Sequence, residues 1–139
     1  MDRTQHGVRD ASLVKTKALP AAGAAASTDG IDTGARTGRG AALEDVEYRV
    51  SIPATPSLVE DKTIIVDIQT DNDVAFGSAT TLIDNAITVT GAAQAAGGAA
   101  AEYRFRLPSD AERYLRATAT VLAAGGDNTG VDFTLEALF

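Results

Sequence analysis

The chain has 139 residues, the length of one ordinary domain, and carries a formal charge of −7 from 12 Lys and Arg against 19 Asp and Glu. This acidic balance argues against a nucleic-acid-binding protein, which needs a basic surface, and no apolar run approaches the roughly 20 residues of a membrane span. Because the chain has no Cys and a single His, His6, disulfides, Cys–His and Ser–His–Asp catalysis, and multi-histidine or cysteine metal sites are excluded.

Residues 1–42 are predicted to form an extended N-terminal arm. They contain no aromatic residue and are dominated by Gly, Ala, Ser, Thr and Asp, so they cannot bury enough apolar surface to offset the entropy of ordering. Six basic and four acidic residues give this segment a charge of +2, which leaves −9 on residues 43–139. Two interpretations of a mildly basic arm on an acidic body stay open: a disordered tail, which is the commoner case, or a segment that orders on the surface of a partner. The candidate contact residues of the arm are Arg3, Arg9, Lys15, Lys17, Arg36 and Arg39.

The first half of the body is predicted to form β-strands. Apolar and polar residues alternate over 46–52 and over 63–70, the two-residue period of a half-buried strand. The segment 80–90 is predicted to be a strand, a turn at Asp84-Asn85 and a second strand. The side chains expected to face the core here are Val46, Tyr48, Val50, Ile52, Ile64, Val66 and Ile68.

The second half continues the pattern. Strands are expected at 101–107, 113–122 and 131–139, with turn formers dense in 123–130 and one possible helical turn at 108–115. Their expected inward side chains are Tyr103, Phe105, Leu107, Leu115, Ala117, Ala119, Val121, Val131, Phe133 and Leu135. Six or seven short strands predict an all-β fold, a β-sandwich or jelly roll, over residues 43–139. The small residues within 113–122 predict a thin core or a close neighbouring sheet or subunit.

Three carboxylates, Asp67, Asp71 and Asp73, crowd into and after the strand 63–70. They do not fit a calcium-binding EF-hand loop, because Ala75 and Phe76 occupy positions that would need a ligand and a glycine. Asp and Asn side chains commonly bond to their own backbone in turns. We therefore interpret this stretch as a polar hairpin turn and expect no metal, cofactor or catalytic residue.

Four of the body's six basic residues, Arg104, Arg106, Arg113 and Arg116, fall within thirteen positions. We expect them on the outer faces of two neighbouring strands. Two interpretations stay open: pairing with nearby carboxylates, or a surface between subunits, where Arg is favoured. The candidate subunit contacts are Arg104, Arg106, Arg113, Arg116 and Tyr114.

Three ordered blocks of the sequence resemble one known family. "AAASTDGIDTG" (24–34), "VDIQTDNDVAFGSATTL" (66–82) and "LPSDAERYLRATATV" (107–121) are similar to the small capsid cement, or decoration, proteins of tailed bacteriophages. The resemblance implies a jelly-roll body, a homotrimer, no catalysis, and attachment to the major capsid protein on the outer surface of the virion. On that basis, the arm is expected to contact the capsid and the sandwich to form the trimer.

Three rival functions share some of these features. A head-fibre or tail component of the virion shares nearly all of them. A carbohydrate-binding module would need exposed aromatic platforms, whereas this chain has no Trp and three Tyr. A β-sandwich hydrolase would have to work through carboxylates alone, such as Asp71 and Asp73.

Overall fold

The computed structural model describes residues 13–34 and 46–138, which form nine β-strands and no α-helix. In chain order the strands are β1 (Val14–Ala18), β2 (Ala25–Ser27), β3 (Ile31–Asp32), β4 (Glu47–Ile52), β5 (Thr63–Asp71), β6 (Thr80–Thr90), β7 (Ala101–Arg106), β8 (Tyr114–Val121) and β9 (Asp132–Leu138). Within the described residues, no helix has the length and hydropathy needed to cross a membrane. The prediction of an all-β fold is confirmed.

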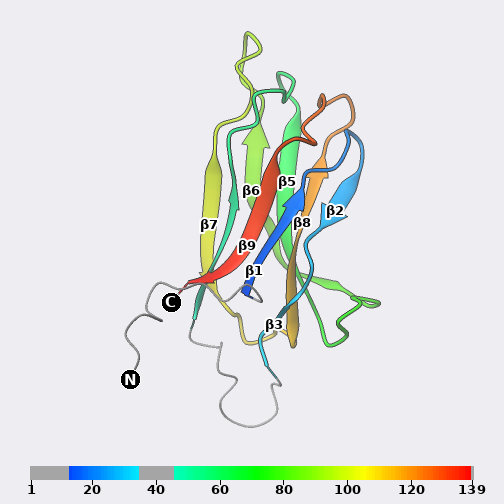
Figure 1. Ribbon diagram of the computed structural model, residues 1–139, viewed down its shortest axis with the longest axis vertical. Helices are drawn as coiled ribbons and strands as arrows, with labels where there is room; N and C mark the ends of the chain where they lie inside the picture. Colours follow the sequence, from blue (N-terminus) through cyan, green and yellow to red (C-terminus); the bar gives the residue numbers. More distant parts are fainter. Residues whose placement is uncertain (1–12, 35–45, 139) are drawn as a thin grey trace.

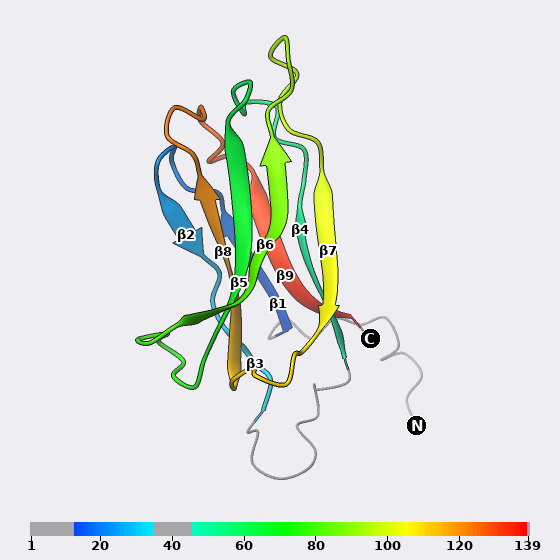
Figure 2. The same ribbon diagram turned by 180° about the vertical axis from the view of Figure 1, so that it is seen from behind.

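The strands form two antiparallel sheets that pack as a jelly-roll-like β-sandwich (Figures 1 and 2). One sheet has the order β1-β9-β4-β7, and the other has the order β2-β8-β5-β6, with β3 also paired to β8. Most connections carry the chain from one sheet to the other, so strands that are consecutive in sequence mostly lie in different sheets.

The core lies between the sheets and follows the predicted alternation. In β8, Leu115, Ala117, Ala119 and Val121 are fully buried, as are the matching inward residues of β4 and β5. Some Cα atoms of β8 lie within 8 Å of β9 in the opposite sheet.

The predicted division into an arm at 1–42 and a body at 43–139 is wrong for the described part of the arm. β1 pairs with β9 along Val14–Ala18, and β2 and β3 pair with β8. Leu19 and Ile31 belong to the core. A segment poor in large apolar residues is ordered here because its backbone hydrogen bonds extend two existing sheet edges. Residues 1–12 and 35–42 lie outside the described residues.

The turn predicted at Asp84-Asn85 is also wrong, because β6 runs unbroken through both residues. Instead the pairing with β5 shifts register between Val66 and Ile68, which marks a β-bulge. Asn85 takes the left-handed conformation, with φ of 52°, and its backbone N–H donates to Asp67 Oδ1 at 2.7 Å. Asp67 faces outward as expected.

The edge strand β7 departs from its expected pattern. Phe105 is buried and stacks on Tyr48 with ring centroids 5.6 Å apart, whereas Tyr103 is 38% exposed and stacks on the outer side of Phe105. Because β7 has a partner on one side only, its inward side chains are not all covered. The segment 108–113 that follows makes a turn with an Ala111 N–H to Pro108 oxygen bond, without a helix.

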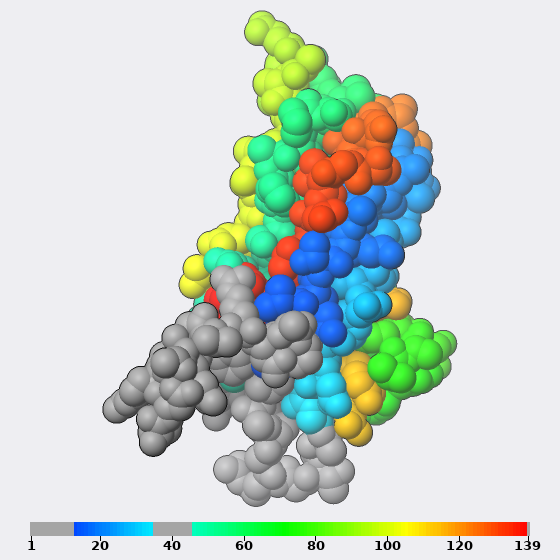
Figure 3. All heavy atoms as spheres, in the orientation of Figure 1, coloured from blue at the N-terminus to red at the C-terminus, as the bar shows by residue number. Residues whose placement is uncertain are grey.

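The two ends of the sandwich differ. β1 and β4 begin, β9 ends, and β3 lies at one end, which we call the terminal end (Figure 1). The opposite, loop end carries the segments 19–24, 53–62, 91–100 and 122–131. The segment 91–100 projects furthest (Figure 3) and has the sequence GAAQAAGGAA, without a charged residue.

Candidate functional surfaces

Two of the six predicted arm cations, Lys15 and Lys17, lie in the described residues. Both belong to β1, where Lys15 is half-buried opposite Leu135 and Lys17 is exposed opposite Phe133. They therefore sit on the edge of the body. Arg3, Arg9, Arg36 and Arg39 lie outside the described residues.

The arginines predicted for a subunit contact do not share one surface. Arg104 and Arg106 belong to β7 in the first sheet, whereas Arg116 and Tyr114 belong to β8 in the second. The expectation that their two strands are neighbours is wrong, because the chain crosses between sheets at 107–113. Arg113, just before β8, donates to Asp32 at 2.9 and 2.8 Å.

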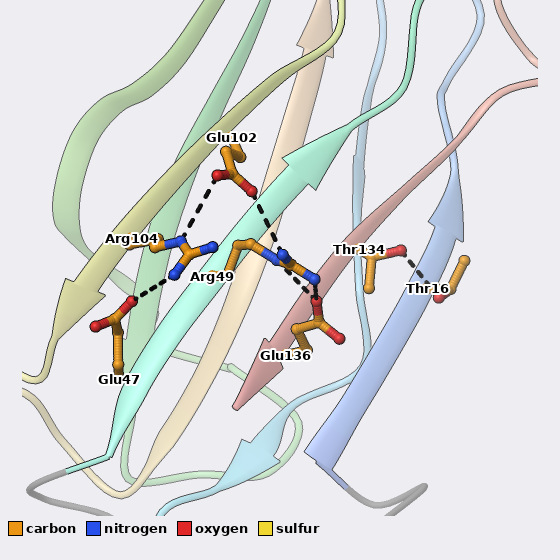
Figure 4. Close-up of polar contacts among 7 residues, drawn as sticks. All are labelled: Thr16, Glu47, Arg49, Glu102, Arg104, Thr134 and Glu136. Carbon is orange, nitrogen blue, oxygen red and sulfur yellow. Dashed lines mark hydrogen bonds and ion pairs between the residues drawn. The ribbon is translucent and has the colours of Figure 1, made fainter. Parts of the chain in front are cut away.

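Arg104 also pairs within the chain, on the outer face of the first sheet. Its guanidinium lies 3.4 Å from Glu47 and 3.6 Å from Glu102 (Figure 4). Pairing with nearby carboxylates, one of the two interpretations left open by the sequence, therefore holds for Arg104 through Glu102, whereas Arg113 pairs with Asp32, which is 81 positions away. Whether any of these residues also touches a second subunit stays a prediction.

The centre of this face is an ion pair that the sequence analysis missed. Arg49 on β4 donates from Nε to Glu136 Oε1 on β9 at 2.9 Å, and one of its Nη atoms contacts the same oxygen (Figure 4). The Glu136 side chain is only 2% exposed and that of Arg49 is 23% exposed. The hydrogen bond to Glu136 raises the pKa of Arg49, against a lowering by burial. No signal in the sequence pointed to this pair, because Glu136 falls on the polar side of the alternation together with Asp132 and Thr134.

The rest of this face is polar but exposed. Arg49 also reaches Glu102 at 3.5 Å, and Thr16 and Thr134 bond across β1 and β9 at 3.2 Å (Figure 4). Arg and Glu side chains alternate across this face from β7 to β9, so neighbouring carboxylates neutralise the positive charges. Such a face holds the sheet together and offers no single-sign field to a ligand.

The acidic stretch after β5 is a turn, as predicted. Asp71 is buried and accepts the N–H groups of Asp73 and Ser78 at 3.0 and 2.8 Å, while Asp73 accepts the N–H of Ala75. The backbone hydrogen bonds, that of Asp73 first, lower the pKa of Asp71. These carboxylate oxygens are occupied by backbone donors.

The turn 123–130 is built in the same way. Asp127 accepts both the N–H and the hydroxyl of Thr129, at 3.1 and 2.6 Å, and these bonds lower the pKa of Asp127. Across the part of the chain that the structure describes, no group of three or more His, Asp or Glu residues is arranged to hold a metal ion.

Comparison with known proteins adds no relative: no family model and no curated protein matches the chain.

Proposed function

We propose that this protein is a structural, non-catalytic component of a phage virion, a cement protein that binds the outer surface of the capsid as a homotrimer. The proposal rests on the resemblance of residues 24–34, 66–82 and 107–121 to that family. The jelly-roll-like sandwich is the body that this resemblance implies.

One structural observation supports surface attachment in particular. The strand ends that adjoin 1–12 and 35–45, namely the start of β1, the end of β3 and the start of β4, lie together at the terminal end (Figures 1 and 2). The four remaining arm cations, Arg3, Arg9, Arg36 and Arg39, belong to the sequence segments that are contiguous with these strand ends. A protein that attaches to a surface by one end can use two such segments in each subunit to contact that surface.

The homotrimer multiplies these contacts. Three copies carry six such segments, and linked weak contacts give firm retention without any single strong site. The attached protein holds neighbouring capsomers together because its segments reach more than one of them.

The test of location uses intact phage particles from the organism that encodes the protein. Antibodies against the folded protein are expected to label the heads of intact particles, in immuno-electron microscopy, because a cement protein lies outside the shell. Labelling of tails or head fibres would instead support the second candidate, a fibre or tail component. Labelling only after particles are disrupted would overturn both.

The test of attachment uses heads stripped of the protein. Purified protein is expected to co-sediment with them, and a variant with Arg3, Arg9, Arg36 and Arg39 all changed to Gln is expected to bind at least tenfold more weakly. The matched control is Lys62→Gln, which removes a cation that lies at the loop end. Equal binding by all three proteins would contradict attachment through the terminal end.

A further inference from the structure

A cleft of about 470 Å³ opens on the flank of the sandwich, near the terminal end. Its walls come from four places: β1, the segment around the β2–β3 connection, β8, and the loop 72–79, which stands out beside it (Figure 3). We call it the Arg116 cleft. Its lining residues are Lys15, Ser27, Thr28, Asp29, Gly30, Val74, Ala75, Phe76 and Arg116.

Hydrogen bonds with side chains of neighbouring strands hold the guanidinium of Arg116 in place. Its Nε donates to Gln69 Oε1 at 2.8 Å, and the same oxygen accepts the hydroxyl of Thr118 at 3.1 Å. Thr118 is in turn bonded to Ser27 at 2.8 Å. This chain of polar side chains across β5, β8 and β2 fixes the Nε side of the guanidinium, and within residues 13–34 and 46–138 its two Nη groups donate no hydrogen bond.

Phe76 covers Arg116 from a strained position. Its ring centre lies 4.4 Å from the guanidinium carbon, a cation–π contact, and its φ is 54°, a conformation rare for a bulky side chain. A Cβ on Gly30 would lie 2.7 Å from the ring, so only glycine leaves room for it there. Strain of this kind persists where the surroundings enforce it, often at binding sites.

The two cations of the cleft lack anionic partners in the described part of the chain. Neither Lys15 nor Arg116 forms an ion pair there, although the other arginines with resolved contacts, Arg49, Arg104 and Arg113, all do. Burial lowers the pKa of Arg116, and the more distant Asp71 only partly offsets this. A partly desolvated cation without a directly contacting carboxylate is unfavourable, so an anion that enters the cleft is stabilised.

The other lining residues narrow the class of anion. Asp29 reduces the charge of the lining to +1, which disfavours a phosphate dianion and suits a monoanion. Val74, 64% exposed, and the exposed Ala75 offer apolar contact beside the cations. A carboxylate flanked by apolar groups matches both features.

We propose that the Arg116 cleft binds a carboxylate side chain presented, next to apolar residues, by a protein partner. The Nη groups of Arg116 and the ammonium of Lys15 receive the carboxylate, while Val74 and Ala75 contact the neighbouring apolar group. The inference stands apart from the proposed function, because binding is measured on the isolated protein.

The test is a titration followed by nitrogen–proton NMR, including the Arg Nε–H signals, with the peptide acetyl-Leu-Glu-Leu-amide. Saturable shifts are expected at Ser27, Ala75, Phe76 and the Arg116 side chain, with affinity in the millimolar range typical of one ion pair with little burial. The Gln peptide, acetyl-Leu-Gln-Leu-amide, is expected to bind about tenfold more weakly.

Variants distinguish binding of the peptide in the Arg116 cleft from nonspecific electrostatic attraction to the protein surface. Arg116→Gln and, independently, Lys15→Gln are expected to weaken Glu-peptide binding severalfold, whereas Lys62→Gln at the loop end leaves it unchanged. Lys15→Gln keeps the test decisive if Arg116→Gln disturbs the fold, because Lys15 lies on the edge strand β1 and forms no ion pair there.

Four outcomes would overturn the proposal: no saturable shift, equal affinity for the Glu and Gln peptides, tighter binding of inorganic phosphate than of the Glu peptide, or equal loss in Lys62→Gln.

Discussion

At the scale of single residues, Arg49 and Glu136 form the most deeply buried ion pair among the described residues. Glu136 lies on the outer face of its sheet, yet its side chain is almost fully covered, and Arg49 neutralises it. Removal of one partner from a buried pair leaves an uncompensated charge, which costs far more than the intact pair contributes.

Arg49→Ala is therefore expected to lower the free energy of unfolding by about 3 kcal/mol. Arg104→Ala, on the same face but 53% exposed, is the matched control and is expected to cost less than about 1 kcal/mol. Urea unfolding followed by circular dichroism measures both. Equal losses in the two variants would show that Glu136 does not depend on Arg49.

Asp71 and Asp32 make stability depend on acid pH. The pKa of each is lowered from its ordinary value of 3.8, that of Asp71 mainly by the backbone N–H of Asp73 and that of Asp32 mainly by the side chain of Arg113. Because the folded-state pKa lies below the unfolded value, their contribution is complete above pH 3.8 and is lost as pH falls through the folded-state pKa.

The midpoint of thermal unfolding is thus expected to fall steeply below about pH 4. Asp71→Asn is expected to unfold at lower temperature at pH 7, since an amide cannot accept both N–H groups, and to show a flatter decline with acid. Scanning calorimetry between pH 7 and pH 2 measures both slopes. Parallel curves for the two proteins would contradict the role of Asp71.

At the scale of elements, the bulge in β6 depends on one backbone conformation. Asn85 has a positive φ, which Asn and Gly adopt more readily than other residues, and a β-branched side chain is strained there.

Asn85→Val is expected to lower the free energy of unfolding by about 2 kcal/mol, whereas Asn85→Gly changes it by less than about 1 kcal/mol. Thr88→Val, an exposed position of ordinary strand geometry in β6, is the control and is expected to be nearly neutral. Denaturant midpoints rank the variants. A tolerated Val at position 85 would indicate that the bulge relaxes.

The segment 14–32 is an element of the fold, because it covers the edges of β8 and β9. A chain that begins at Ala42 lacks β1, β2, β3 and the buried side chains Leu19 and Ile31. It is expected to lose cooperative thermal unfolding and to aggregate, because two sheet edges and part of the core are exposed.

The matched comparison is a chain that begins at Leu13, which keeps every described strand and is expected to unfold cooperatively. Calorimetry and size-exclusion chromatography distinguish the two chains. A cooperative transition in the chain from Ala42 would restore the division into arm and independent body.

At the scale of the whole molecule, net charge opposes self-association. Each copy carries −7, so three copies repel one another, and salt screens this repulsion. If the proposed homotrimer forms, light scattering is expected to give three times the 14.3 kDa chain mass, with tighter association at 200 mM than at 20 mM NaCl. A monomer at both salt concentrations would contradict a trimer in solution.

The sequence alone determined the fold class and, for most strands, which side chains point toward the core. Alternation has a period of two, so it places Ile64, Val66 and Ile68 inward without any knowledge of their neighbours. The Asp71 and Asp127 turns were equally predictable, because their hydrogen bonds are local in sequence.

Only the tertiary structure decided what depends on pairing between distant segments. The chain order does not reveal that β7 and β8 belong to different sheets, that residues 14–32 complete both sheets, or that Arg49 meets Glu136 across 87 positions. The Arg116 cleft depends on four such distant segments. Local patterns record which side of a strand is apolar, whereas strand partners are chosen by the free energy of the whole assembled core.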